Sequence, residues 1–247
     1  MSRQLELALS DQLQLYGERV HNHVKELRVK EGVADFVLSP TPLNGERLRW
    51  ISKLASAISS PSVATVASYL SATRPHTVGE ITAKSGLTRD TVARAMSRLV
   101  DRDVVGRTQG VGFLLKRPIR EADLGLWALE LKLKDWKRGM YQALQYKAFA
   151  HSVAIVVPRE SREVVSSRLG QFRAHRVGIL TFDMTTGAIR VLVRPGRSHP
   201  KSLEHYLYAL SVFVRGLPWH PDYGGPPKAP ALPHQQRRNS QPRQARR

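Results

Sequence analysis

The sequence predicts an α/β fold in which a mixed sheet is flanked by helices, together with a mainly helical unit and a basic C-terminal tail. Three observations lead to this prediction. Apolar strand-like segments alternate with amphipathic helix-like segments after residue 118. Three helical segments and a hairpin signal occupy residues 61–117. The segment 218–247 is rich in Pro, Gln and Arg, and has too few apolar residues to form a core, so we expect it to be disordered.

The first sixty residues predict two helices separated by extended chain. Residues 5–20 carry leucines on one helical face, which favours a helix. Residues 24–29 have an irregular extended pattern, and 34–38 form a short apolar strand after a turn at Gly32. A second amphipathic helix is expected at 46–58.

Residues 61–117 predict three helices followed by a β-hairpin. The helices are expected at 63–72, 77–85 and 88–101, with Gly86 in a tight turn and Thr88 as the N-cap of the third. Apolar residues then flank a glycine-containing turn at 109–112, which is a hairpin signal.

The remaining part of the chain alternates between strands and helices. The segment 153–157 is a continuous apolar run, as expected for a strand buried on both faces. In order, we expect a strand at 126–133, a helix at 135–151, a strand at 153–157, a helix at 161–175, a hairpin from 177–183 and 188–193, and a helix at 200–215.

The segment TVGEITAKSGLTRDTVARAMSRLV (77–100) resembles the helix-turn-helix of bacterial winged-helix regulators. Its apolar positions would pack the second and third helices together, and the turn after the third helix would form the wing. The resemblance implies that the outward face of the third helix binds double-stranded DNA and that Arg107 in the wing contacts the DNA backbone. The alternative is a unit used only for protein contacts or packing. The predicted outward residues are Arg89, Thr91, Arg94, Ser97 and Arg98.

The segment WALELKLKDWKRGMYQALQYKAFA (127–150) resembles the central motif of PD-(D/E)xK, or restriction-endonuclease-like, phosphodiesterases. The motif consists of Glu130-x-Lys132 on a strand and Gln142 near the middle of the next helix, with Tyr146 one turn later. Residues two apart on a strand point to the same face, so Glu130 and Lys132 should project together. The intervening leucines at 129, 131 and 133 should face the core.

This resemblance also implies a carboxylate on the preceding strand, because a hard divalent cation binds several oxygen ligands. We assign this role to Asp35, with Asp123 as the alternative. Asp35 and Glu130 would then bind Mg²⁺ or Mn²⁺, Lys132 would position the attacking water, and Gln142 would steady the amine or the phosphate. If Asp35 has this role, the winged helix is an insertion between two core strands. Such an insertion is tolerated because the entropic cost of closing a loop increases only slowly with its length.

The charge of the chain constrains its partners. Its 247 residues include 39 Lys and Arg against 20 Asp and Glu, a formal net charge of +19. A polyanion is the natural partner, because each phosphate contact releases a condensed counterion. We find no apolar run near membrane length and no export signal, so we expect no membrane association and a cytoplasmic location. Cysteine is absent, which excludes disulfides and thiolate chemistry within the sequence.

The predicted organisation is a nuclease-like core split by a winged-helix domain. Residues 1–45 and 118–217 would form the core, 46–117 the inserted domain, and 218–247 the disordered tail. Two functions follow from it. One is a Mg²⁺- or Mn²⁺-dependent DNA endonuclease targeted by the winged helix. The other is a non-catalytic regulator, in which the nuclease-like fold serves as a scaffold that grips DNA or holds a homodimer together.

Overall fold

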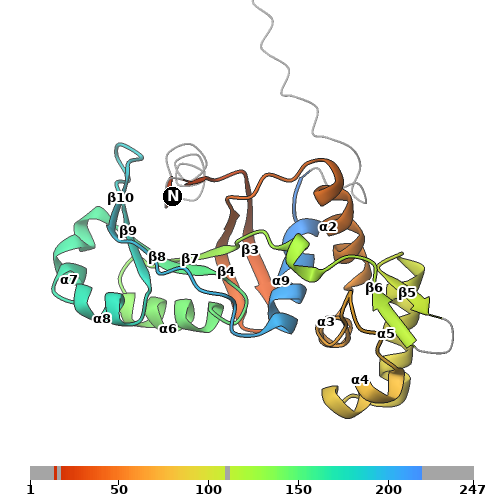
Figure 1. Cartoon of the computed structure of the whole chain (residues 1–247). Helices are drawn as coiled ribbons and strands as arrows, with labels where there is room; N and C mark the ends of the chain where they lie inside the picture. Colours follow the sequence, from red (N-terminus) through yellow and green to blue (C-terminus); the bar gives the residue numbers. More distant parts are fainter. Residues whose placement is uncertain (1–13, 16–17, 109–111, 219–247) are drawn as a thin grey trace, which may run out of the picture.

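The computed structural model describes residues 14–15, 18–108 and 112–218 of the chain (Figure 1). Its central feature is a six-stranded mixed sheet with the strand order β10-β9-β8-β7-β4-β3. The strands are β3 (Asn22–Val29), β4 (Gly32–Ser39), β7 (Trp127–Leu131), β8 (Ser152–Pro158), β9 (Gly178–Phe182) and β10 (Ile189–Val193).

The direction of the strands changes in the middle of the sheet. β3, β4 and β7 are antiparallel, whereas β7, β8 and β9 are parallel, and β10 returns antiparallel to β9. Parallel neighbours need crossover connections, which helices supply here. α6 (Trp136–Tyr146) connects β7 to β8, and α7 (Arg162–Ser166) with α8 (Leu169–Ala174) connects β8 to β9.

The two faces of the sheet are buried in different clusters. Ala128 on β7 belongs to the large core that also contains residues of the helices. Trp127 and Leu129 belong to a smaller cluster on the opposite face, and Leu131 packs against its edge. The prediction that Leu129 and Leu131 face a core is therefore confirmed, although this core is the smaller of the two, and the prediction for Leu133 is wrong. Leu133 lies beyond the strand and is 57% exposed.

A long connection between β4 and β7 contains most of the remaining elements. It begins with α2 (Gly45–Ala57). Residues 61–117, here called the helix–hairpin unit, follow it and contain three helices and two strands. These are α3 (Pro61–Ser68), α4 (Val78–Ser85), α5 (Arg89–Asp101), β5 (Val105–Thr108) and β6 (Gly112–Leu115).

Local sequence signals explain the helix boundaries in this unit. Thr77 caps α4 through a capping box with Glu80. Gly86 ends α4 with φ +68°, a left-handed conformation that favours glycine. Thr88 then caps α5 by accepting a hydrogen bond from the Thr91 backbone N–H.

The helix–hairpin unit is joined to the sheet by two helices. α9 (Leu203–Arg215) contacts β3, α2 and α3, and Figure 1 shows α2 and α9 between the sheet and the unit. Apolar residues from the sheet and the unit belong to one continuous buried cluster. We therefore expect the position of the unit to be fixed by packing rather than by a flexible linker.

Several predicted boundaries differ from the structure. Gln14–Leu15 and Glu18–Arg19 pair as short antiparallel strands, β1 and β2, so the predicted helix at 5–20 is wrong at its C-terminal end. Its earlier part lies outside the described residues, as do the tip of the hairpin at 109–111 and the tail from 219. The single helix expected at 161–175 is divided into α7 and α8. Ser167 Oγ donates to the Val164 carbonyl, a local hydrogen bond that competes with helix continuation.

α6 is shorter than predicted, because it ends at Tyr146 rather than at residue 151. The chain then tightens through hydrogen bonds from Ala148 N to Gln145 O and from Phe149 N to Tyr146 O. His151 N donates to Leu126 O, which brings the chain back to the sheet. Among the described residues, no helix has the length and apolar character needed to cross a membrane.

Candidate functional site

Asp35 and Glu130 lie on neighbouring antiparallel strands. Phe36 of β4 pairs with Leu129 of β7, and continuing this register places Asp35 opposite Glu130 on the same face of the sheet. The Leu131 backbone N–H donates to Asp35 Oδ2 at 2.7 Å, although the two residues are 96 positions apart. The structure thus brings together the two carboxylates that the sequence analysis selected.

Lys132 and Tyr146 both contact the buried Glu130 carboxyl group. Lys132 Nζ lies 2.7 Å from Glu130 Oε1, and the Glu130 side chain is only 3% exposed. The Tyr146 hydroxyl lies 2.8 Å from Glu130 Oε2 and 2.6 Å from the Val33 carbonyl. One phenolic proton cannot be donated fully to both oxygens. The Tyr146 hydroxyl therefore shares its proton between the Glu130 carboxylate and the Val33 carbonyl.

The pKa of Glu130 is raised above its usual range. Burial is the main cause, and the negative charge of Asp35 adds to it, while Lys132 and Tyr146 act in the opposite direction. Burial and the adjacent Glu130 also raise the pKa of Tyr146, which keeps the phenol protonated. The site therefore contains two adjacent acidic side chains, Asp35 and Glu130, and one basic side chain, Lys132, next to them.

Helix α6 forms the wall of the site next to these groups. Asp135 caps it by accepting a hydrogen bond from Arg138 N at 3.0 Å. A Cβ at Gly139 would lie 2.6 Å from Lys132 Cγ, so only glycine lets the Lys132 stem lie against this helix. Gln142 is on the same helix, one turn before Tyr146, and its buried Oε1 has no hydrogen-bond partner. Sequence reasoning missed Gly139, and a glycine in the middle of a helix was the available signal.

The donor set at this site fits a divalent cation with few protein ligands. Within the described part of the chain, no group of three His, Cys, Asp or Glu residues is arranged to hold a metal. The cluster offers the carboxylates of Asp35 and Glu130. Mg²⁺ is commonly bound by one or two carboxylates, with waters and substrate phosphate completing its shell. The raised pKa of Glu130 comes mainly from burial, with a smaller contribution from the negative charge of Asp35.

Asp123, the alternative acid, has a different environment. It precedes β7, whereas Glu130 lies near the end of that strand. Its Oδ1 lies 3.2 Å from the Tyr206 hydroxyl and 3.3 Å from His151 Nε2. Burial opposes ionisation, but hydrogen bonds from His151, Gly125 N–H and Tyr206 lower the pKa of Asp123 to about 2. Asp123 therefore belongs to a separate polar cluster.

Some of the residues selected on α5 are exposed to solvent, whereas others form hydrogen bonds within the protein. Arg89, Arg94 and Ser97 are exposed on one side of the helix, and Arg107 is exposed on β5, with its guanidinium 5.8 Å from the centre of the Phe113 ring. Thr91 is half-buried and bonds to the Thr88 hydroxyl at 2.9 Å.

Arg98 does not point outward as predicted. Its Nε donates to the Ala57 carbonyl at 2.8 Å and its Nη2 to the Ser56 carbonyl at 3.2 Å. These carbonyls are at the C-terminal end of α2, where backbone acceptors have no partner within the helix. Arg98 therefore holds α5 against α2, a role that the helical periodicity of α5 alone could not reveal.

Comparison with known proteins gives no independent assignment. No protein-family model, no curated protein and no solved structure matches this chain. Because function resides in sites rather than in folds, the arrangement of the residues above must carry the functional argument.

The buried Glu130 predicts a specific pH dependence of stability. A raised folded-state pKa means that the folded protein binds this proton more tightly than the unfolded chain does. The free energy of unfolding should therefore fall as pH rises from the ordinary carboxyl value of 4.5 through the raised value. Glu130→Gln has no proton to lose at this position. Its free energy of unfolding relative to that of the parent should therefore increase with pH, by about 1.4 kcal/mol for each tenfold by which the folded parent binds the Glu130 proton more tightly than the unfolded chain does.

Urea denaturation of both proteins between about pH 4 and pH 8 measures this difference. The matched control is Glu163→Gln, because Glu163 is an exposed residue of α7. Its stability relative to the parent should be nearly independent of pH. A Glu130→Gln difference that is equally flat would contradict the assigned environment of Glu130.

Proposed function

We propose that this chain is a DNA-binding protein with a Mg²⁺- or Mn²⁺-dependent DNA phosphodiesterase site. The observation that carries the proposal is the convergence of Asp35 on β4, Glu130 on β7 and Lys132 directly after β7, although a long insertion separates the two strands in the sequence. A carboxylate pair supplies oxygen ligands for a divalent cation, and such a cation can assist phosphodiester hydrolysis by stabilising charge and lowering the pKa of a bound water.

The order of the strands supports the same proposal. An antiparallel β3–β4–β7 arrangement is followed by the α6 crossover to the parallel strand β8. This resembles a restriction-endonuclease-like core in which the Asp strand pairs with the Glu-x-Lys strand. The helix–hairpin unit then occupies the insertion between those two strands, and it resembles a winged helix.

Each residue of the site has a proposed part in the chemistry. Asp35 and Glu130 would hold the cation, which would supply charge stabilisation at the phosphate and a bound water of lowered pKa. Lys132 neutralises Glu130 in the absence of the cation and would orient the attacking water once the cation takes over that charge. Tyr146 fixes the orientation of the Glu130 carboxyl group, and Gln142 offers an unpaired amide oxygen beside it.

The helix–hairpin unit would bring DNA to the protein. Arg89, Arg94 and Ser97 share an exposed side of α5, and Arg107 is on the adjoining hairpin. The formal net charge of +19 favours association with a polyanion.

A non-catalytic regulator is the second candidate. The observation in its favour is the close ion pair between Lys132 and Glu130, which is what a structural pair in a degenerate site would also show. The two candidates share DNA binding and differ in metal binding and cleavage.

Substitutions on α5 test the DNA-binding part of the proposal. The probe is a duplex that the parent protein selects from a random library. Arg94→Ala should weaken binding by about 1–3 kcal/mol if Arg94 reads base edges, with an unchanged melting temperature. Its described hydrogen bond is to the Asp90 carbonyl in its own helix, at 3.4 Å. Arg98→Ala should instead lower the melting temperature, because it leaves the α2 carbonyls unpaired.

Fluorescence anisotropy at fixed salt concentration measures the binding, with Arg168→Ala, an exposed residue between α7 and α8, as the control. Equal affinity of Arg94→Ala and the parent would exclude α5 as the reading surface. Failure of the parent to select any duplex would exclude DNA binding itself.

Metal-dependent stabilisation separates the enzyme from the regulator. Mg²⁺ or Mn²⁺ should raise the melting temperature of the parent, because an ion that binds only the folded state stabilises it by mass action. Asp35→Asn and Glu130→Gln should each abolish the increase. Lys132→Met keeps the stem that packs against Gly139, so it should retain the increase and lose DNA nicking.

Differential scanning fluorimetry and a supercoiled-plasmid nicking assay provide the two readouts. Stabilisation that persists in both acid variants would place the cation elsewhere. A parent protein that shows neither stabilisation nor nicking would leave the regulator as the better account.

A further inference from the structure

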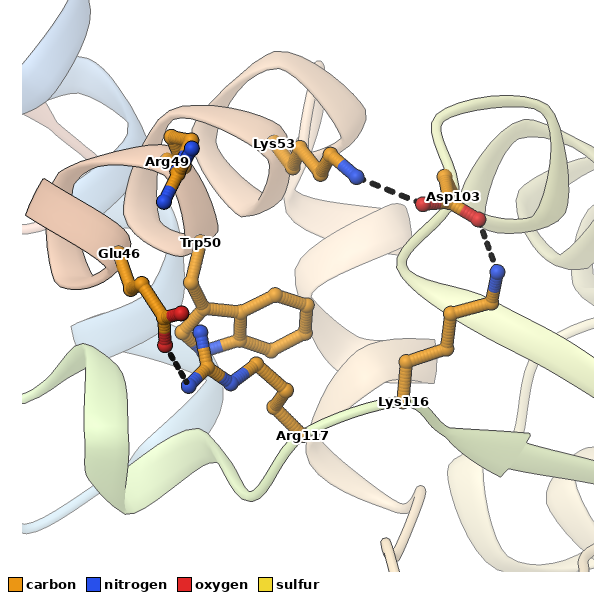
Figure 2. Close-up of a pocket in the computed structure, with 7 residues that line it drawn as sticks. All are labelled: Glu46, Arg49, Trp50, Lys53, Asp103, Lys116 and Arg117. Atoms are coloured by element: carbon orange, nitrogen blue, oxygen red, sulfur yellow. Dashed lines mark hydrogen bonds and ion pairs between the residues drawn. The ribbon is translucent and has the colours of Figure 1, made fainter.

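A basic cleft lies between α2 and the helix–hairpin unit, away from the carboxylate site (Figure 2). Its volume is about 390 Å³. Residues of α2, the turn after α5 and the segment that leaves β6 form its walls. The lining residues are Glu46, Arg49, Trp50, Lys53, Asp103, Lys116 and Arg117.

Positive charge dominates this cleft, with four basic side chains against two acids. Asp103 bridges Lys53, at 2.6 Å, and Lys116. Figure 2 shows the two lysines reaching this carboxylate from different directions, each at its own oxygen. Their hydrogen bonds hold the pKa of Asp103 at about 2. Arg49 takes part in no ion pair among the described residues, so its positive charge is uncompensated.

Trp50 adds a neutral donor that also lacks an acceptor. Its side chain is buried, with 3% exposure, and the indole Nε1 has no hydrogen-bond partner. Its neighbour Arg117 pairs with Glu46 at 3.2 Å and with Glu121 at 3.0 Å, and its remaining N–H groups are further donors at the same cleft. A buried N–H that has lost water and gained no acceptor is unfavourable, and Trp50 is part of the lining of this cleft, although its Nε1 is itself buried.

We propose that this cleft binds a phosphate group. Phosphate combines negative charge with several acceptor oxygens, and the cleft combines uncompensated positive charge with several donors. The Asp103 carboxylate already bridges two lysines in the way that a phosphate oxygen would. It acts as an internal substitute for the anion, and removing its charge should make the cleft a better phosphate site.

The phosphate has two chemical sources that the experiment distinguishes: the backbone of DNA and a small phosphate compound. The inference goes beyond the proposed function, because it requires neither cleavage nor base reading. Inorganic pyrophosphate and a short duplex of random sequence are the two probes. Isothermal titration calorimetry measures the first, and fluorescence anisotropy at low salt measures the second.

Three variants of the full chain test the proposal: one should weaken phosphate binding, one should strengthen it, and one is a control. Arg49→Gln leaves no described partner unpaired and should weaken phosphate binding by about threefold to tenfold. Asp103→Asn should strengthen it by a similar factor. Asp103 has a φ of +60°, a conformation that asparagine tolerates well, so the turn should be preserved. Arg47→Gln is the matched control, since Arg47 is an exposed residue of the same helix outside the cleft.

The order of affinities decides the proposal. Affinity that increases from Arg49→Gln to the parent to Asp103→Asn, with Arg47→Gln equal to the parent, supports it. That order with pyrophosphate identifies a small phosphate compound as a ligand, and the same order with DNA identifies the backbone. Folded variants that show this order with neither probe would overturn it. A parent that fails to bind any DNA contradicts the proposed function, while the pyrophosphate titration still decides the fate of the cleft.

Discussion

The hydrogen bond between the Leu131 backbone and the Asp35 carboxylate closes the longest connection in the sheet. It adds to the backbone pairing of β4 with β7 and joins Asp35, inside β4, to the end of β7, with α2 and the helix–hairpin unit inserted between the two strands. Without this pairing the β3–β4 hairpin would lose its place in the sheet, and Asp35 would lie far from Glu130. The insertion is tolerated because the strand pairing and the shared core with α9 fix both of its ends.

A balance of burial and charge then defines the carboxylate site. Glu130 is buried among apolar neighbours and beside Asp35, which raises its pKa, while Lys132 and Tyr146 limit that cost. Gly139 makes the balance possible, because it lets the lysine stem pass close to α6. Under the proposed function, a cation bound by both carboxylates would offset the repulsion between Asp35 and Glu130.

The residues of the carboxylate site could be predicted from the local sequence pattern. The direction of Arg98 and the basic cleft could not be predicted, for physical reasons. The alternation of residues on a strand placed Glu130 and Lys132 on one face, and the strand order brought Asp35 to them. The inward direction of Arg98 could not be predicted, because its partners are carbonyls at the end of another helix. The basic cleft was missed for the same reason, since its walls come from segments far apart in the sequence.

A double-mutant cycle between Asp35→Asn and Glu130→Gln, measured on the free energy of unfolding at neutral pH, tests the central claim most directly. Without divalent ions we expect a repulsive coupling between the two carboxylates of about 0.5–3 kcal/mol. In saturating Mn²⁺ the coupling should become attractive, because both groups would bind the same cation. Effects that add to within about 0.3–0.5 kcal/mol under both conditions would show that the two acids do not form one site.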